Sequence, residues 1–167
     1  MLDLNLDRVY TSCAEHFAND ADFEERARYY AEKVAAIHIP AQITESHIKN
    51  LNAIIDDIYT EAAFDAVMAE NEYEDIRRKL NVVLKDYYEG HNEQARTAAA
   101  YQFAQNYPIK FDDDGNPLEF VNLFELESLW RRRATYMETI LNILQQKSNR
   151  LINDLGVLKI EGQVTKN

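Results

Sequence analysis

The clearest pattern in the chain is an apolar residue at every seventh position between residues 122 and 155, a segment without Gly or Pro. Residues seven apart lie on the same side of an α-helix, so the row forms one apolar stripe on a long helix. Such a helix spans roughly 50 Å at about 1.5 Å per residue. We predict that the stripe forms an interface with another helix or another subunit, through Leu123, Trp130, Met137, Leu144 and Leu151.

A second long segment, between Pro40 and Gly90, also lacks internal Gly and Pro and repeats an apolar residue every seven positions. A companion row begins with Leu51 and Ile58 and moves by one position at Ala66, which indicates a local change of helical phase. Gly90 is of a residue type that commonly ends helices. The sequence therefore predicts a second long helix, with a main row of Ile48, Ile55, Ala62, Ala69, Ile76 and Val83.

Residues 109–120 change to a two-residue alternation on either side of a run of turn-forming residues. This pattern predicts a β-hairpin, which we expect to pack on the helices because an isolated hairpin is only marginally stable. Pro, Gly and capping residues delimit the other segments. The full set is helices at 4–18 and 22–38, a long helix at 44–89, a short helix at 92–106, the hairpin at 109–120, a long helix at 122–155 and a tail at 156–167.

These elements predict an all-α fold, namely a single helical domain over residues 1–167. The domain is an elongated bundle built on two long antiparallel helices, at about 44–89 and 122–155. The apolar stripes extend further than a compact domain of this size would cover, so we expect the two helices to pair with each other or with copies of themselves, as in a coiled coil.

The chain is acidic, with 18 basic and 29 acidic side chains and a net charge of −11. Residues 1–128 carry 11 basic and 26 acidic side chains, whereas residues 129–167 carry 7 basic and 3 acidic ones. An acidic surface repels nucleic acid and anionic membranes, so general electrostatic binding to either is disfavoured. Only the C-terminal segment has a basic balance.

The location that we predict is intracellular and reducing, either the cytoplasm or a particle assembled inside the cell. The chain contains one cysteine, Cys13, which cannot form a disulfide within the chain. No run of about 18 apolar residues indicates a membrane span, and the N-terminal residues lack the pattern of a signal peptide.

No catalytic, cofactor-binding or metal-binding signature stands out. Aligning Gly115 with the glycine of an EF-hand loop places Lys110 and Val121 where calcium ligands are required, so the acidic turn is better explained as a hairpin turn. The Glu-x-x-His pairs of a di-iron bundle are absent. Cys13 lies on an apolar face and is better explained as a buried residue than as a nucleophile. We therefore predict a protein that is not an enzyme.

Two runs of basic residues are candidates for contact with an anion or an acidic partner. Three consecutive residues cover most of the circumference of a helix, so at least one Arg must approach the packed side. The runs could bind nucleic-acid phosphates, but ion pairs with the acidic helices of this chain or a neighbour explain them better. They are Arg77, Arg78 and Lys79 in one helix, and Arg131, Arg132 and Arg133 in the other.

The leading hypothesis is a helical assembly or adaptor protein that self-associates or docks into a larger complex, a phage-type structural or accessory protein being one form of it. The alternative is a nucleic-acid accessory protein, of the single-strand-binding or recombination-mediator type, that uses the basic C-terminal helix. A third hypothesis, an acidic decoy for a DNA-binding partner, ranks last because the acidic residues are interleaved with Lys and Arg.

Overall fold

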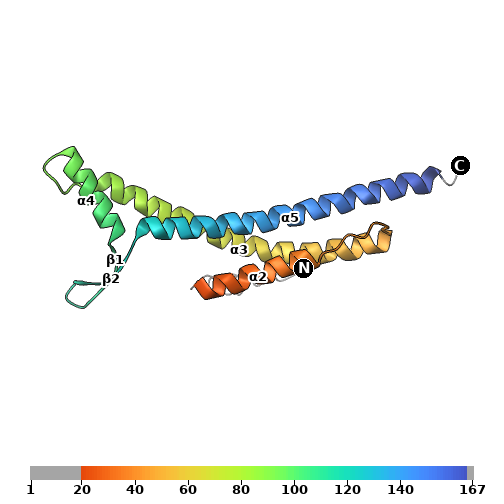
Figure 1. Cartoon of the computed structure of the whole chain (residues 1–167), viewed down its shortest axis with the longest axis horizontal. Helices are drawn as coiled ribbons and strands as arrows, with labels where there is room; N and C mark the ends of the chain where they lie inside the picture. Colours follow the sequence, from red (N-terminus) through yellow and green to blue (C-terminus); the bar gives the residue numbers. More distant parts are fainter. Residues whose placement is uncertain (1–19, 165–167) are drawn as a thin grey trace, which may run out of the picture. The chain divides into compact units, whose positions relative to one another are not determined.

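The computed structural model describes residues 20–164, so the helix predicted for residues 4–18 lies outside the described part of the chain. Figure 1 labels the described elements along the chain. Their order is α2 (Asp20–Ala36), α3 (Glu45–Asp86), α4 (Glu93–Gln105), β1 (Tyr107–Phe111), β2 (Pro117–Val121) and α5 (Leu123–Val164). The predicted fold is confirmed, because α3 and α5 pack together and a small antiparallel hairpin lies between them in the sequence.

The two long helices run antiparallel. The start of α3 faces the end of α5, since Lys159 exerts an electrostatic effect on Glu45. The end of α3 faces the start of α5 in the same way, since Glu127 acts on Arg77. Each long helix is divided between two compact units, which comprise, among the described residues, 20–68 with 135–164 and 69–134. The single domain over residues 1–167 stays a prediction.

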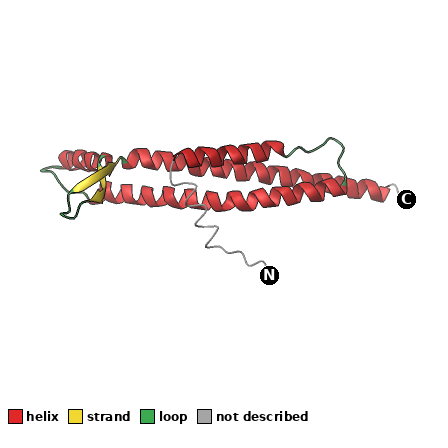
Figure 2. Cartoon of the chain, turned by 90° about the horizontal axis from the view of Figure 1, so that it is seen from below, coloured by secondary structure: helices red, strands yellow, loops and turns green. Residues whose placement is uncertain are grey.

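The first unit is a packing of three helical segments, from α2, α3 and α5, and Figure 2 shows its helices in a second view. Two hydrogen bonds from α5 hold α2, one at the middle of the helix and one directly after its last residue. The Tyr136 hydroxyl donates to the Ala27 carbonyl oxygen at 2.7 Å, and the Lys147 ammonium donates to the Ile37 carbonyl oxygen, also at 2.7 Å. The core contains apolar side chains from all three helices and from Ile37, which directly follows α2; those of the helices are Tyr30, Val34, Ile48, Ile55, Ile58, Ala62, Met137, Ile140, Leu144 and Leu151.

The second unit has a smaller core, to which α3, α4 and α5 all contribute. Leu80 and Val83 of α3 pack with Ala104 of α4 and Leu123 of α5. Partly buried aromatic rings surround this cluster, and the rings of Tyr87 and Phe103 stack with centroids 4.7 Å apart. Aromatic side chains bury large areas, whereas the buried residues of α4, Ala100 and Ala104, are small. The rings therefore supply much of the buried apolar area of this core.

Capping residues begin α3 and α4 where the sequence places them. The Thr44 hydroxyl accepts a hydrogen bond from the His47 amide at 3.3 Å. The Asn92 side chain accepts one from the Ala95 amide at 2.8 Å. Each side-chain oxygen satisfies a backbone donor that has no partner within the first helical turn.

The predicted end of the last helix is wrong. We expected Gly156 to terminate it and residues 156–167 to form a tail, but α5 continues through Gly156 to Val164. Glycine within a helix costs only about 1 kcal/mol relative to alanine. Continuing the helix keeps Leu158 partly buried beside the loop that contains Pro40 and Ile43, which offsets this cost.

Gly90 does not directly follow α3 either, because α3 ends at Asp86. It precedes α4 instead, with a φ of 140°, a value that L-residues rarely adopt. A Cβ atom at this position would lie 2.7 Å from the backbone nitrogen of Arg96. Gly90 therefore lets the chain approach the first turn of α4 closely.

Replacing Gly90 by Ala should lower the free energy of unfolding by about 1–3 kcal/mol, because it combines backbone strain with a steric clash. The matched control is Gly156→Ala, where an added Cβ meets nothing within 4 Å. This control should raise the free energy of unfolding by about 0.5–1 kcal/mol, since alanine favours the helix. Urea unfolding followed by circular dichroism measures both changes, and an unaffected Gly90→Ala variant would contradict the close approach.

Candidate interaction surface

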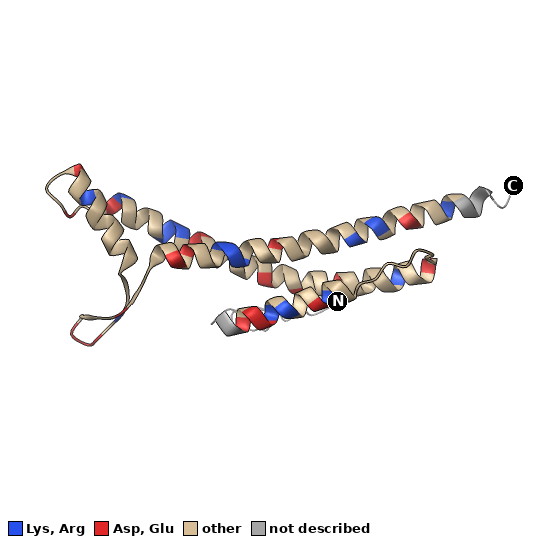
Figure 3. Cartoon of the chain, viewed as in Figure 1, with Lys and Arg blue, Asp and Glu red and all other residues tan. Residues whose placement is uncertain are grey.

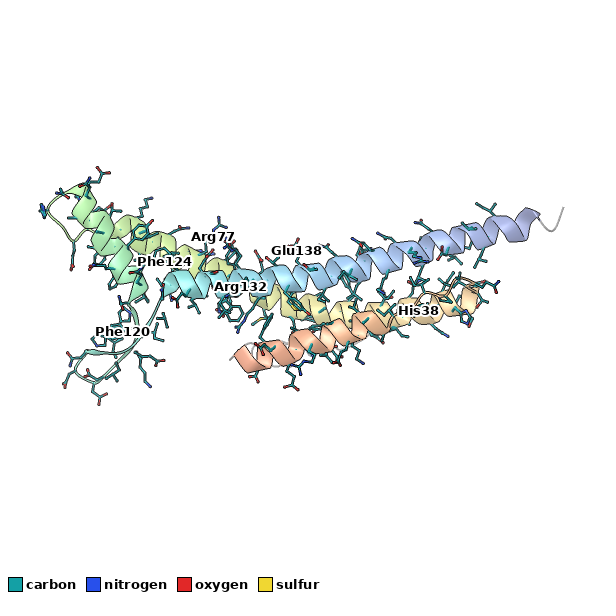
Figure 4. All side chains as sticks on the ribbon, viewed as in Figure 1. His38, Arg77, Phe120, Phe124, Arg132 and Glu138 are labelled. Carbon is teal, nitrogen blue, oxygen red and sulfur yellow. The ribbon has the colours of Figure 1, made fainter. Side chains whose placement is uncertain are left out.

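The β-hairpin exposes four large apolar side chains, two on each strand. Ile109 and Phe111 of β1 are 48% and 54% exposed, and Leu118 and Phe120 of β2 are 59% and 53% exposed. Figure 4 labels Phe120 on the hairpin and Phe124 in the first turn of α5. The prediction that the hairpin packs on the helices therefore holds only at its base. We call the four side chains the hairpin surface.

The base of the hairpin is anchored in the core of the second unit. Tyr107 at the start of β1 and Val121 at the end of β2 are paired in the ladder and pack against the core cluster. The ring of Tyr107 contacts that of Phe103 edge to face, with centroids 5.5 Å apart. The Lys79 ammonium lies 5.6 Å from the Tyr107 ring centroid. These contacts fix the base while the rest of the hairpin extends into solvent.

The turn of the hairpin is acidic, as Figure 3 shows. The Asp112 carboxylate organises it by accepting hydrogen bonds from the amides of Asn116 and Asp114, at 2.7 and 3.0 Å. The bonds from Asn116 and Asp114 lower the pKa of Asp112, because they favour the charged carboxylate. Asp113 and Asp114 remain exposed, so the hairpin surface carries negative charge at its tip.

The predicted interface residues on α5 lie inside the chain. Met137, Leu144 and Leu151 are each 0% exposed in the first unit. Leu123 is 1% exposed and packs in the second unit, where Trp130 is 9% exposed. The stripe is covered by the chain itself, so a second subunit would find almost none of its surface.

The basic runs divide between core and surface. Arg133 is 4% exposed, and its guanidinium lies 4.6 Å from the Trp130 ring centroid. Arg131 and Arg132 are exposed on α5. In the run on α3, Arg77 pairs with Glu74 at 3.0 Å and Arg78 with Asp75 at 3.2 Å. Ion pairing, the explanation that the sequence favoured, thus accounts for two members of that run.

A buried polar cluster joins α2 to α3, and sequence reasoning missed it. Asp65 is 0% exposed, and its carboxylate accepts hydrogen bonds from Tyr30 and Arg26, at 2.5 and 2.8 Å. Arg26 also pairs with Glu61 at 2.6 Å, and Glu61 accepts a hydrogen bond from Tyr29 at 2.8 Å. Burying a charge is costly unless it is paired and hydrogen-bonded, so these contacts are what permit Asp65 at this depth.

The sequence did contain a signal for this cluster. Asp65 continues the companion row of α3, seven residues after Ile58, at the position where the apolar row moves to Ala66. A carboxylate in an apolar row requires a partner, whereas the shift alone indicates only a change of helical phase. Burial and the hydrogen bond to Asp65 raise the pKa of Tyr30, because both disfavour the phenolate.

Among the described residues, no helix is both long and apolar enough to cross a membrane. The same part of the chain contains no group of three or more His, Cys, Asp or Glu side chains placed to hold a metal ion. Compared with protein-family models, with curated proteins and with solved structures, the chain gives no match.

Replacing Tyr30 by Phe should lower the free energy of unfolding by about 1–2 kcal/mol, since it removes a donor from a buried carboxylate. Tyr29→Phe is the matched control and should cost less, about 0.5 kcal/mol, because Glu61 is partly exposed and solvent can replace the lost bond. Chemical unfolding near neutral pH measures both. Equal costs for the two variants would contradict the importance of burial.

The pH dependence of the same variants follows from the raised pKa of Tyr30. Its ordinary value is 10.0, so the unfolded chain loses this proton first as the pH rises. The stability that Tyr30 contributes is therefore complete below pH 10 and falls above it. The Tyr30→Phe variant should show a smaller alkaline loss of stability than the wild-type chain.

Proposed function

We propose that the chain is a non-enzymatic assembly or adaptor protein that docks into a larger complex through the hairpin surface. The exposure of Ile109, Phe111, Leu118 and Phe120 carries this proposal. Several large, half-exposed apolar side chains on one small element are typical of interaction sites. Phenylalanine side chains in particular lose little conformational entropy when a partner covers them.

The size of the surface indicates how much it contributes to binding. Covering four half-exposed side chains stabilises a complex by on the order of 4 kcal/mol. This gain corresponds to a dissociation constant of about 1 mM, before the entropic cost of association is subtracted. A stable complex therefore needs further contacts, such as charge pairs, beside the hairpin surface.

The buried polar cluster of α2 and α3 supports a non-enzymatic function, because its carboxylate, Asp65, has a structural role. Its strongest donors, from Arg26 and Tyr30, are directed at Asp65, which has no exposed surface. A catalytic carboxylate must reach its substrate. Asp65 is enclosed, and its contacts hold α2 against α3.

The double variant Phe111→Ser and Phe120→Ser should dissociate the assembly, because it removes the two largest side chains of the hairpin surface. Sedimentation velocity of the purified chain at micromolar concentration should show a shift toward the monomer. The matched control is Val82→Ser, which alters an exposed residue on α3 in the same unit, 53% exposed, and should leave sedimentation unchanged.

The wild-type chain, the double variant and the Val82→Ser variant can also be tagged and expressed in their source cells. The size of the species that each forms in a lysate then tests for a complex with other proteins. Wild-type and Val82→Ser chains should migrate in species larger than a monomer, and the double variant should not. A wild-type chain that migrates as a monomer in both settings, or a double variant that keeps the wild-type size, contradicts the proposal.

The second candidate function is a nucleic-acid accessory protein, which one observation favours. Arg131 and Arg132 are exposed side by side, and no ion pair holds either of them within residues 20–164. On this candidate, replacing both by Ala weakens binding to single strands and reduces the slope of log affinity against log salt by about 1.4. Arg77→Ala with Arg78→Ala is the control, since these residues already pair with Glu74 and Asp75. Absence of salt-sensitive binding excludes the candidate.

A further inference from the structure

The outer side of α5 in the first unit carries a row of uncharged residues. The row turns away from the core, because the buried side chains of Leu144 and Leu151 lie on the opposite side of the helix. Its members are spaced alternately by four and three residues, which is the spacing of a helix seam that packs on another helix. All of them are exposed, and we call them the α5 outer row: Asn142, Gln146, Asn149, Asn153, Gly156 and Ile160.

Three apolar side chains near the end of α5 lie in this row or beside it. Ile160 belongs to the row and is 63% exposed, and Ile152 and Val157 flank the row on its two sides, 57% and 54% exposed. An added Cβ at Gly156 would meet nothing within 4 Å, so another helix can approach α5 closely at this position. A helix packed along the row would therefore bury all three apolar side chains.

The chemistry of the α5 outer row favours a second copy of the same chain as its partner. The chain has a net charge of −11, so two copies repel each other least where their surfaces carry no charge. Asn and Gln amides are both donors and acceptors, so each can pair with its own counterpart. A two-fold symmetric interface requires such self-complementarity. A strongly charged partner would find no opposite charge in the row.

A parallel, in-register pair satisfies the row best. Each residue of the row then lies opposite the same residue of the other copy, so amides meet amides and Ile160 meets Ile160. Gln145 already orients Asn149, because its amide donates a hydrogen bond to the Asn149 side-chain oxygen at 3.1 Å. Residues at one edge of such a seam meet residues five positions further on at the other edge. This offset brings Ile152 of one copy against Val157 of the other.

We propose that two copies of the chain pair in parallel through the α5 outer row, with Asn142 and Asn149 each opposite its counterpart. This inference rests on the proposed function, because it supplies the further contacts that the hairpin surface needs for a stable complex. The row is shorter than about three heptads, the length typical of a coiled coil, and polar residues in a helix seam cost stability. The pairing therefore forms where the hairpin surface has already brought copies into one assembly, and it does not hold free copies together at micromolar concentration.

Disulfide trapping tests the pairing, since it captures a weak contact covalently. In a Cys13→Ser chain, which has no other cysteine, Asn149→Cys should form a disulfide-linked dimer with oxidised glutathione. The matched control is Asn50→Cys, which replaces an exposed Asn on α3. The control should give about tenfold less dimer, because its Cα atoms do not come within reach of each other. Gel electrophoresis without reductant measures both.

A mixture of two cysteine variants tests the direction and the register. Residues 142 and 149 lie about 10.5 Å apart along the helix, farther than the roughly 7 Å between Cα atoms that a disulfide can bridge. Asn142→Cys and Asn149→Cys chains, one of them tagged, should therefore form like-with-like dimers and about tenfold fewer mixed ones. Mixed dimers in equal amount would show an antiparallel or shifted pair and would overturn the proposed register.

A charge exchange tests the contribution of the row to the assembly. Asn142→Asp with Asn149→Asp should raise the concentration needed for assembly about tenfold, because like charges then face each other. Asn142→Lys with Asn149→Lys should have the same effect, and an equimolar mixture of the two variants should restore assembly. Asn50→Asp is the matched control and should assemble as the wild-type chain does. All substituted positions are exposed, and thermal unfolding verifies that every variant is folded.

The failures of the two proposals are distinguishable. Asn149→Cys chains that stay monomeric on oxidation overturn the pairing. Rapid reaction of their thiols with maleimide would then show an open face, and slow reaction would show that another part of the chain covers it. If Phe111→Ser with Phe120→Ser still dissociates the wild-type assembly in that case, the proposed function stands with different further contacts. If those two changes leave the assembly intact while Asn149→Cys chains dimerise, the proposed function falls and the pairing stands.

Discussion

Burial of one apolar row on each long helix is the interaction on which the rest of the structure depends. The row on α5 is enclosed at Met137, Leu144 and Leu151, and the row on α3 is enclosed at Ile48, Ile55 and Ala62. Fully burying side chains of this size stabilises a fold by about 1.5–3 kcal/mol each. Because the chain itself covers these rows, any assembly must use other parts of its surface.

Within this apolar packing, one polar cluster sets where α2 lies. Asp65 can be buried only where Arg26 and Tyr30 reach its carboxylate. Sliding α2 along α3 by one turn would separate these partners and leave an uncompensated charge, which costs several kcal/mol. Apolar contacts tolerate such a shift far better, because they have little directionality. The cluster therefore supplies a specificity that the apolar rows lack.

A small sheet usually packs its apolar side chains on a core, but this hairpin does so only at its base. Its base, at Tyr107 and Val121, is held by aromatic packing, while four large apolar side chains further along the strands are half-exposed. Its edges are protected by proline and irregular register, which limits indiscriminate strand pairing. A hairpin that exposes apolar side chains and blocks its edges is suited to contacts made through side chains.

Within the described residues, the sequence by itself determined the helical segments up to Gly156, the place of the hairpin and the apolar face of each long helix. These properties follow from local periodicity and from the placement of Gly, Pro and capping residues. Only the tertiary structure decided what covers each apolar face, why Asp65 occupies an apolar row and why α5 continues through Gly156. An apolar repeat indicates that one face of a helix is buried. Which segment packs on that face depends on residues distant in the chain. For the same reason the sequence could not show that the chain itself covers the α5 stripe, nor that the hairpin leaves four apolar side chains half-exposed, because an alternating pattern looks the same whether or not a helix covers it.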